Sequence, residues 1–313
     1  PLASLPSKCT GMPLTVAVVR ERLPGERRVA LVPDTARKYA GLGAVVRMEQ
    51  SAGIESHFLD SDYEGVIAVP GVAEAYAGAD LILRVTPPSA EEIAALPEGA
   101  MLIGLLAPYA DRERIAALNR RRITAFALEL LPRISRAQSM DALSSQGACS
   151  GYQCGLIAAA RCTKFFPMLT TAAGTIRPAR VLVIGAGVAG LQAIATCKRL
   201  GAMVEGYDVR AAAREQIESL GAKFVDTGVS ADGAGGYARE LTADEKAQQA
   251  EKLAKAVAAA DVVITTAAIP GKRAPLIITR DMVGRMKYGA IIVDMAAESG
   301  GNCELTQPGE HVV

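Results

Sequence analysis

The stretch RVLVIGAGVAGLQAIATCKRLGAMVEGYD, residues 180–208, decides the fold of the second half of this 313-residue chain. RVLVI predicts a buried strand, and the residues after the turn predict a helix. Gly185, Gly187 and Gly190 form the pattern GxGxxG at the turn between them. Gly185 permits a tight turn, Gly187 lets a pyrophosphate approach the backbone, and Gly190 lets the helix pack closely on the strand. The stretch therefore predicts a dinucleotide-binding βαβ unit.

The end of the same stretch indicates which dinucleotide is preferred. The second predicted strand ends on Asp208, 18 residues after Gly190. A carboxylate here accepts hydrogen bonds from the 2′ and 3′ hydroxyls of the adenosine ribose and repels a 2′-phosphate, which favours NAD(H) over NADP(H). Arg210 could attract a phosphate, but we interpret it as a solvated charge at the start of the next helix. The alternative is a purely structural glycine turn.

Two further segments follow predicted strands, where this fold binds its ligands. TTAAIPGKRAP (265–275) follows DVVI, and VDMAAESGGN (293–302) follows AII. Their small residues and turn glycines let backbone approach a flat ring, although simple strand-end turns would carry the same residues. The cofactor contacts predicted in the glycine turn, after the second strand and in these two segments are Gly185, Gly187, Val188, Ala189, Gly190, Asp208, Val209, Arg210, Thr266, Ala267, Ala268, Pro270 and Glu298.

Strand and helix patterns alternate through the rest of the chain, which indicates βαβ units and parallel sheets. Helices are predicted at DTARKYAGLGA (34–44) and DRERIAALNRR (111–121), each with an Asp as N-cap. A long helix rich in small residues is expected near residues 141–166. The predicted strands are TVAVV (15–19), AVVRM (44–48), LILRV (81–85), MLIGLL (101–106) and ITAFAL (123–128), then RVLVIG (180–185), AMVEGYD (202–208), KFVD (223–226), DVVITTA (261–267) and AIIVDMA (290–296).

These patterns predict an α/β protein of two Rossmann-like, doubly wound parallel-sheet domains joined by the long helix, with a cleft between them. The first domain is expected over residues 1–140 and the nucleotide-binding domain over 141–304. Residues 305–313, together with sequence beyond them, are expected to complete the first domain. Residues 1–11 are expected to be a lead that precedes the first strand.

Composition excludes several classes of protein. The chain has 34 Lys and Arg against 33 Asp and Glu, so it lacks the basic surface of a nucleic-acid-binding protein. No apolar run approaches the roughly 20 residues that span a bilayer, and reduced thiols suggest an intracellular compartment. Six cysteines without a CxxC pair, beside two histidines, argue against a metal site. We interpret Cys149, Cys154 and Cys162 as buried small residues in helices.

Five stretches spread from residue 20 to residue 305 resemble a single family. They are RERLPGERRVALVP, RISRAQSMDALSSQ, LTTAAGTIRPARVLVIGAGVAGLQAIATCKRLGA, TTAAIPGKRAP and IIVDMAAESGGNCEL. With them the chain resembles domain I, the NAD(H)-binding component of proton-translocating nicotinamide nucleotide transhydrogenase. The resemblance implies hydride transfer from NADH to NADP⁺, with NADP(H) on a partner domain and a membrane domain that moves protons. It also implies a homodimer at the cytoplasmic face of a bacterial inner membrane, or on the matrix side in mitochondria.

The resemblance assigns the nicotinamide side of the site to RISRAQSMDALSSQ. Arg133, Gln138 and Asp141 match the family's loop of Arg, Gln and Asp, and Ser144 lies one helical turn on. By resemblance these four residues hold the nicotinamide and its ribose, and Gln138 reaches the NADP(H) of the partner. Direct hydride transfer between two nicotinamides requires positioning and exclusion of water, and no protein acid or base.

Gly235, Gly236 and Tyr237 resemble the family's mobile loop, which folds over bound nucleotide, and Gly236 and Tyr237 are included among the predicted cofactor contacts. A lid with glycine hinges fits that role. An idle surface loop is the alternative reading of the same residues.

Alanine dehydrogenase, a related family, shares the two-domain plan and gives the rival hypothesis. Those enzymes supply a Lys after the LILRV-type strand and a His in the following strand, where this chain has Arg84 and Ala107. Glu298 takes the place of their catalytic acid but lacks its partners. These differences favour a transhydrogenase component over an amino-acid dehydrogenase, and a non-catalytic NAD-binding module stays as a third hypothesis.

Overall fold

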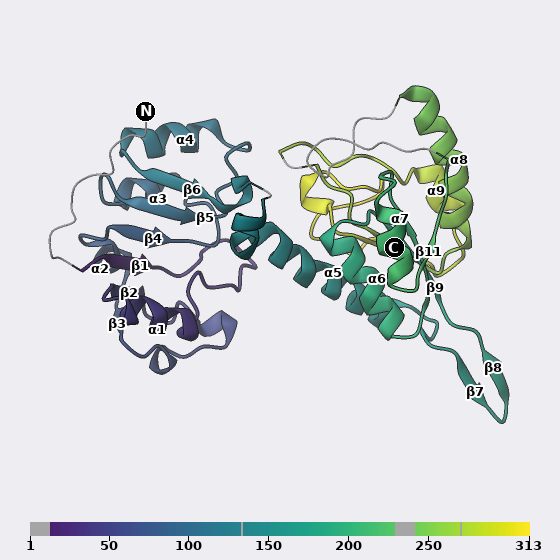
Figure 1. Ribbon diagram of the computed structural model, residues 1–313, viewed down its shortest axis with the longest axis horizontal. Coiled ribbons are helices and arrows are strands. Elements are labelled where there is room, and N and C mark those ends of the chain that lie inside the picture. Colours follow the sequence, from purple (N-terminus) through teal and green to yellow (C-terminus); the bar gives the residue numbers. More distant parts are fainter. Residues whose placement is uncertain (1–12, 133, 229–241, 270) are drawn as a thin grey trace. The chain divides into compact units, whose positions relative to one another are not determined.

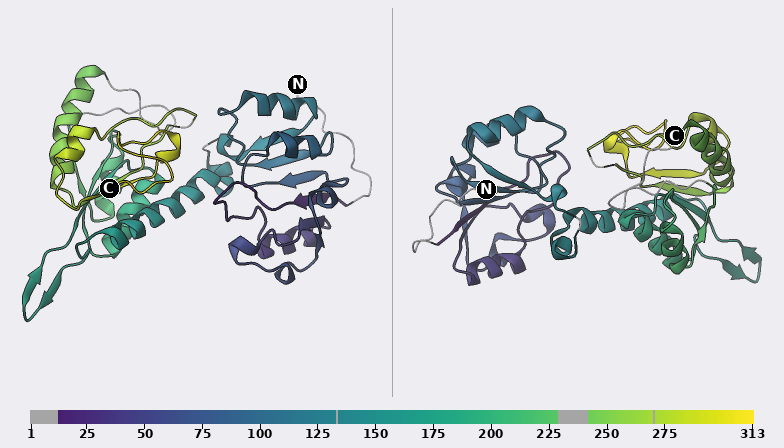
Figure 2. Two further views of the ribbon diagram at one scale, coloured as in Figure 1. Left: turned by 180° about the vertical axis from the view of Figure 1, so that it is seen from behind. Right: turned by 45° about the horizontal axis from the view of Figure 1, so that its top comes forward.

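The computed structural model describes residues 13–132, 134–228, 242–269 and 271–313, without the side chains of residues 243 and 245–248. The chain divides into two compact units, unit 1 over Pro1–Asp141 and unit 2 over Ala142–Val313. Each unit is an α/β domain built on one parallel sheet (Figure 1; Figure 2). The predicted fold class is therefore confirmed.

Unit 1 has a six-stranded parallel sheet within its described residues, in the order β3-β2-β1-β4-β5-β6. The order runs outward from β1 and β4 in both directions, as a doubly wound sheet does. Alternate residues of β1 enter the cores on opposite faces, Ala17 on one side and Val16 and Val18 on the other. The strands are β1 (Thr15–Val18), β2 (Val45–Glu49), β3 (Val66–Val69), β4 (Leu81–Leu83), β5 (Met101–Gly104) and β6 (Thr124–Ala127).

Helices cover both faces of the unit 1 sheet. The helix α1 (Pro33–Gly41) packs on one face, and α2 (Val72–Tyr76), α3 (Ala90–Ala95) and α4 (Arg112–Arg120) pack on the other. Asp111 caps α4 as predicted, since its side chain accepts the N–H of Arg114 at 3.0 Å. The predicted cap at Asp34 is wrong. Pro33 already lies in the first turn of α1, and Val32 is the N-cap.

Unit 2 has a five-stranded parallel sheet among its described residues, in the order β11-β10-β9-β12-β13. Val181 and Val183 of β9 face the helices α5, α6 and α7, whereas Leu182 and Ile184 face α8 and α9. The strands are β9 (Arg180–Ile184), β10 (Met203–Tyr207), β11 (Lys223–Phe224), β12 (Val262–Thr265) and β13 (Ile291–Asp294). The helices are α5 (Ala142–Arg161), α6 (Val188–Arg199), α7 (Ala213–Ser219), α8 (Ala243–Ala259) and α9 (Arg280–Gly284).

The long helix α5 lies alongside α6 at backbone distance (Figure 1). A Cβ on Gly151 would overlap the carbonyl oxygen of Ala189, and one on Gly155 would lie 2.8 Å from Thr196 Cγ2. The small residues therefore let α5 support the first turn of α6, where the candidate site begins. The predicted helix is confirmed, although it ends at Arg161 and not at residue 166.

Several features differ from the sequence expectations or are absent from them. Strand β3 was not predicted, nor was the antiparallel hairpin of β7 (Leu169–Thr171) and β8 (Gly174–Ile176), which projects from unit 2 (Figure 1; Figure 2). Cys154 is buried in α5 as expected, but Cys149 is exposed and Cys162 is half-buried beyond the end of that helix. Both are too close to the surface for the predicted role.

The last residues pack on unit 2 in this structure. Leu305 lies against the core beside α8 and α9, and the hydroxyl of Thr306 donates to Asp294 at 2.6 Å. Completion of the first domain by residues 305–313, and the cleft between the two domains, stay predictions. Within the described parts of the chain, no helix combines the length and apolar character needed to cross a membrane.

Asp261, immediately before β12, should make unit 2 sensitive to acid. Its carboxylate is buried and accepts the ammonium groups of Lys164 at 2.6 Å and Lys287 at 2.8 Å and the N–H of Arg180 at 2.9 Å. Burial raises the pKa of Asp261, but these partners outweigh it and hold the pKa at about 2. The stabilisation is present above the ordinary pKa of about 3.9 and is lost as pH falls towards 2.

Asp261→Asn should therefore lower the free energy of unfolding by about 1–2 kcal/mol at pH 7, with both lysine partners partly exposed and screened. The difference from the unchanged chain should shrink between pH 4 and pH 2, measured as urea unfolding at a series of pH values. Asp281→Asn is the control, since its ion pair with Arg285 is exposed. Equal losses for both variants at pH 7 would contradict the prediction.

Candidate functional site

The glycine turn after β9 has a backbone geometry that side chains would disrupt. Gly185 has φ +95°, a conformation that favours glycine, and a Cβ on Gly190 would overlap the carbonyl oxygen of Gly185. Gly187 is different, because a Cβ there would meet no described atom within 4 Å. The turn is thus closed on the protein side by Gly185 and Gly190, and open at Gly187 on the side where a ligand would approach.

The segment after β12 lies beside this turn because β12 is the neighbour of β9 in the sheet. The hydroxyl of Thr266 donates to the carbonyl of Gly185 at 3.0 Å, and Ala267 follows it, half-buried. The strand order reverses between β9 and β12, and ligands bind at such a switch point in open α/β sheets. The structure thus brings together the predicted residues Gly185, Gly190, Thr266 and Ala267.

Asp208, directly after β10, is buried and charged. Its carboxylate accepts the N–H of Ala186 at 2.7 Å, the N–H of Arg210 at 2.9 Å, and two bonds from the guanidinium of Arg210 at 2.9 Å each. Burial raises the pKa of Asp208, but the Arg210 and Ala186 bonds hold it below the usual range. The interpretation of Arg210 as a solvated charge is therefore wrong, since it is paired with Asp208.

The pair Asp294 and Asn302 supports the segment after β12 and was not predicted. Asn302 is fully buried and bonds both backbone groups of Ala267, accepting its N–H at 3.1 Å and donating to its carbonyl at 2.8 Å. Asp294 accepts the N–H of Asn302 at 2.8 Å and the hydroxyl of Thr265 at 3.0 Å. A polar pair inside VDMAAESGGN is the sequence signal, which the small residues of that stretch overshadowed.

The remaining predicted cofactor residues lie at varied depths around the turn. Val188 is 43% exposed at the start of α6, and Ala189 behind it is buried. Val209 packs partly into the core beside α8. Ala268 is exposed, as is Glu298 in the short 3₁₀ helix Ala297–Ser299. These positions are compatible with a nucleotide along the strand ends but do not by themselves define contacts.

The predicted nicotinamide-side residues lie where the chain passes from unit 1 to unit 2. Gln138 is exposed in the 3₁₀ helix Ser135–Met140, and Asp141 follows it, half-buried. Ser144 lies in the first turn of α5, half-buried. The residues Arg133, Gly235, Gly236, Tyr237 and Pro270 lie outside the described residues.

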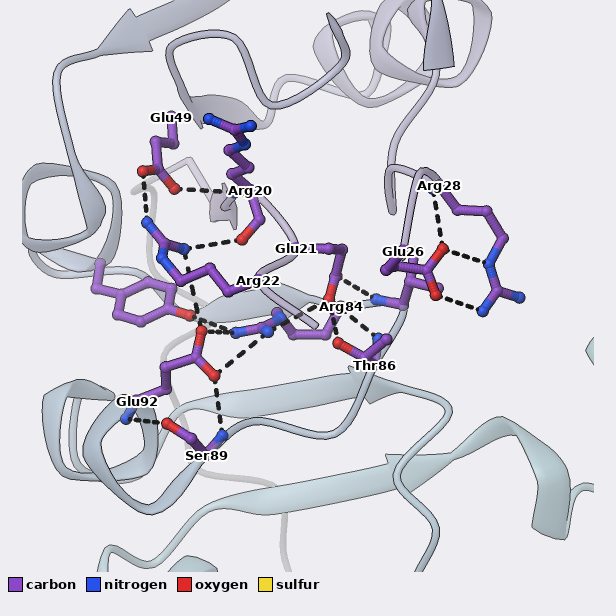
Figure 3. Close-up of polar contacts among 12 residues, drawn as sticks. Arg20, Glu21, Arg22, Glu26, Arg28, Glu49, Arg84, Thr86, Ser89 and Glu92 are labelled. Carbon is purple, nitrogen blue, oxygen red and sulfur yellow. Dashed lines mark hydrogen bonds and ion pairs between the residues drawn. The ribbon is translucent and has the colours of Figure 1, made fainter. Parts of the chain in front are cut away.

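The switch point of unit 1, between β1 and β4, is filled by a buried ion pair (Figure 3). Glu21 follows β1 and Arg84 follows β4, with side chains 2% and 1% exposed and 3.3 Å between Oε2 and Nη2. Glu21 also accepts the N–H groups of Val85 at 2.6 Å and Thr86 at 3.2 Å, as well as the Thr86 hydroxyl. Arg84 donates to Glu92 at 2.8 Å.

This cluster binds protein groups to one another. Burial lowers the pKa of Arg84, but its bond with Glu92 and the charge of Glu21 raise it above the ordinary value. Two cavities of about 590 and 530 Å³ flank the cluster. The larger is lined by arginines and glutamates alike, four of each: Arg20, Arg22, Arg27 and Arg28 with Glu21, Glu26, Glu49 and Glu55. A wall of balanced charge offers no strong preference for an anion or a cation.

Ala107, where the rival hypothesis requires a histidine, also lacks any group that could transfer a proton. It has φ +45°, and its N–H donates to Glu129 Oε1 at 2.5 Å. Arg84, where that hypothesis requires a lysine, is held in ion pairs and stays protonated. The two unit 1 positions expected to serve deamination are thus occupied by residues unsuited to acid–base chemistry.

Comparison with known proteins agrees with the architecture of both units. The model of the alanine dehydrogenase/PNT N-terminal domain matches residues 17–150, and that of the C-terminal domain matches residues 154–313. This chain belongs to the alanine dehydrogenase/PNT family. PNT is pyridine nucleotide transhydrogenase, so the family holds both of the enzymes that the sequence resembles.

Within the alanine dehydrogenase/PNT family the chain is more similar to the transhydrogenases. It is 47% identical to an NAD(P) transhydrogenase alpha subunit of Rhodospirillum rubrum, over 96% of this chain and 81% of that protein. The transhydrogenase structure from Sinorhizobium meliloti matches with a TM-score of 0.87 and 44% identity, covering 96% of this chain and 83% of that one. An alanine dehydrogenase of Halomonas elongata is 31% identical, over 95% of this chain and 76% of that protein.

Proposed function

We propose that this chain is the NAD(H)-binding component of a proton-translocating transhydrogenase. It would hold NADH in unit 2 for direct hydride transfer to NADP⁺ on a partner domain, with proton movement in a membrane domain. A homodimer at the cytoplasmic face of a bacterial inner membrane, or on the matrix side in mitochondria, belongs to the same proposal and rests on the family resemblance.

The observation that carries the proposal is the state of Arg84 and Ala107. An oxidative deaminase needs a group that transfers a proton beside its substrate. Arg84 is tied to Glu21 and Glu92, and Ala107 has no titratable group. Hydride transfer between two nicotinamides needs neither, so the site is consistent with a transhydrogenase and poorly suited to an amino-acid dehydrogenase.

The residues of unit 2 fit a dinucleotide. Open space at Gly187, beside the first turn of α6, leaves room for a pyrophosphate close to the backbone N–H groups. Asp208 would hold the adenosine ribose, and the backbone after Thr266 would lie beside the rest of the nucleotide. Bound NADH would supply the hydride. Asn302 and Asp294 would keep the strand-end segment rigid, so that little reorganisation is needed on binding.

Residues at the passage between the units complete the proposed site. Gln138, Asp141 and Ser144, with Arg133, would orient the nicotinamide and its ribose and keep water from the reacting carbons. Hydride transfer requires the two rings about 3–3.5 Å apart. These side chains would therefore act by positioning, with no proton transferred.

Selective binding of NADH tests the proposal. The chain should bind NADH, and NADPH at least about 100-fold more weakly, because a 2′-phosphate would lie against the buried, ionised Asp208. Isothermal titration calorimetry with each nucleotide measures both affinities. Equal affinities would remove Asp208 from the recognition of ribose, and an absence of NADH binding would refute the proposal.

Gln138→Asn separates binding from transfer. The shorter amide should slow hydride transfer to NADP⁺ on the partner component by at least about tenfold, because small errors in alignment cost rate steeply. The dissociation constant for NADH should change less than about twofold, since Asp208 and the glycine turn are untouched. Stopped-flow transfer and calorimetry give the two values. An unchanged transfer rate would exclude Gln138 from the reaction.

A further inference from the structure

Arg210 occupies the positions on Asp208 that the proposed function assigns to the adenosine ribose. Its Nε donates to Oδ1 and its Nη2 to Oδ2, each at 2.9 Å. The backbone N–H groups of Arg210 and Ala186 occupy the other positions, at 2.9 Å from Oδ1 and 2.7 Å from Oδ2. A carboxylate offers about four acceptor positions. Each oxygen of Asp208 thus already accepts one backbone bond and one guanidinium bond.

The two kinds of donor differ in how they can yield to a ligand. The backbone N–H groups belong to the turns after β9 and β10, whose shape depends on Gly185 and on the strand ends. The guanidinium stands on a flexible stem, and the Arg210 side chain is 24% exposed while that of Asp208 is 8% exposed. Rotation of Arg210 towards solvent would free one position on each oxygen without a change in the turns.

We propose that Arg210 is a specificity-determining residue that closes the ribose subsite in the absence of nucleotide. This inference rests on the proposed function, in which Asp208 binds the ribose of NAD(H). The two ribose hydroxyls displace the two guanidinium bonds, so part of the binding free energy is used to open the subsite. The displaced guanidinium keeps its charge near the ribose, where it lessens the repulsion between Asp208 and a 2′-phosphate.

Two substitutions separate the guanidinium fork from its charge. Arg210→Gln removes both, and Arg210→Lys keeps the charge but cannot form the two-pronged contact with the carboxylate. Arg210→Gln should bind NADH about fivefold more tightly and NADPH about fivefold more weakly. Arg210→Lys should bind NADH more tightly, with NADPH affinity within about twofold of the unchanged chain.

Calorimetric titration of the full chain with NADH and NADPH measures these changes, and thermal unfolding checks that each variant is folded. Arg214→Gln is the matched control because Arg214 carries the same charge but pairs with Asp226 and lies half-exposed on α7. NADH affinity that is unchanged or weaker in a folded Arg210→Gln variant overturns the inference, while NADH binding by the unchanged chain leaves the proposed function intact. Absence of NADH binding in every variant overturns both.

Discussion

Replacing Gly190 with alanine should destabilise unit 2 by about 3 kcal/mol, while the same change at Gly187 should leave its stability nearly unaltered. A Cβ on Gly190 would overlap the backbone oxygen of Gly185, which cannot move without breaking the turn. At Gly187, the N-cap of α6, a Cβ meets no described atom within 4 Å. Alanine as N-cap costs less than about 1 kcal/mol relative to glycine.

Nucleotide binding should separate the two glycines in the opposite way. Gly187→Ala should remain folded yet bind NADH at least about tenfold more weakly, because the methyl group takes the space of the pyrophosphate. Urea unfolding and NADH calorimetry on both variants measure the two effects. Gly284→Ala is a control, since this exposed end of α9 also has open space for a Cβ. A Gly187→Ala variant with full NADH affinity would contradict the assignment of this turn to the nucleotide.

Removing the charge of Glu21 should destabilise unit 1 by about 3 kcal/mol. Glu21→Gln keeps the shape of the side chain but leaves the buried Arg84 with Glu92 as its remaining charged partner in the described network. A buried charge that loses a partner retains the cost of its desolvation. Hydrogen exchange should show the loss in β1 and β4, which this cluster joins, and no change in β9 and β12.

Glu91→Gln is the matched control for the unit 1 cluster. Glu91 lies on the same helix as Glu92 but is exposed, so its neutralisation should change the unfolding free energy by less than about 0.5 kcal/mol. If both variants lost stability equally, the general loss of negative charge would explain the result. If neither did, Glu21 and Arg84 would not stabilise the switch point of unit 1.

The parts of the fold that could be predicted are those encoded by short local patterns. The strand, glycine turn, helix and terminal acid of residues 180–208 all answer constraints within one βαβ stretch, so the geometry at Gly185 and Gly190 followed from spacing. Strand β3 is only four residues long and partly exposed, and so lacks the apolar run that marked the other strands. The hairpin of β7 and β8 is exposed throughout and has no hydrophobic pattern to identify it.

The contacts that could not be predicted join residues far apart in the chain. Glu21 and Arg84 are 63 positions apart, and Ala267 and Asn302 are 35 apart. Only the adjacency of strands in a parallel sheet brings such pairs together, and no local pattern reports it. Arg210 is the opposite case, since it lies two residues from Asp208, but the choice between solvent and carboxylate depends on how the turn after β10 folds.

Hydride transfer between the two nucleotides is the most direct test of the proposed function. The chain is mixed with the NADP(H)-binding component of a transhydrogenase, NADH is added, and reduction of an NADP⁺ analogue with a shifted absorbance is followed. In parallel the chain alone is given NAD⁺ and alanine. We predict one analogue reduced for each NADH oxidised, and no NADH from alanine. NADH formation from alanine, or no transfer while both nucleotides are bound, would contradict the proposed function.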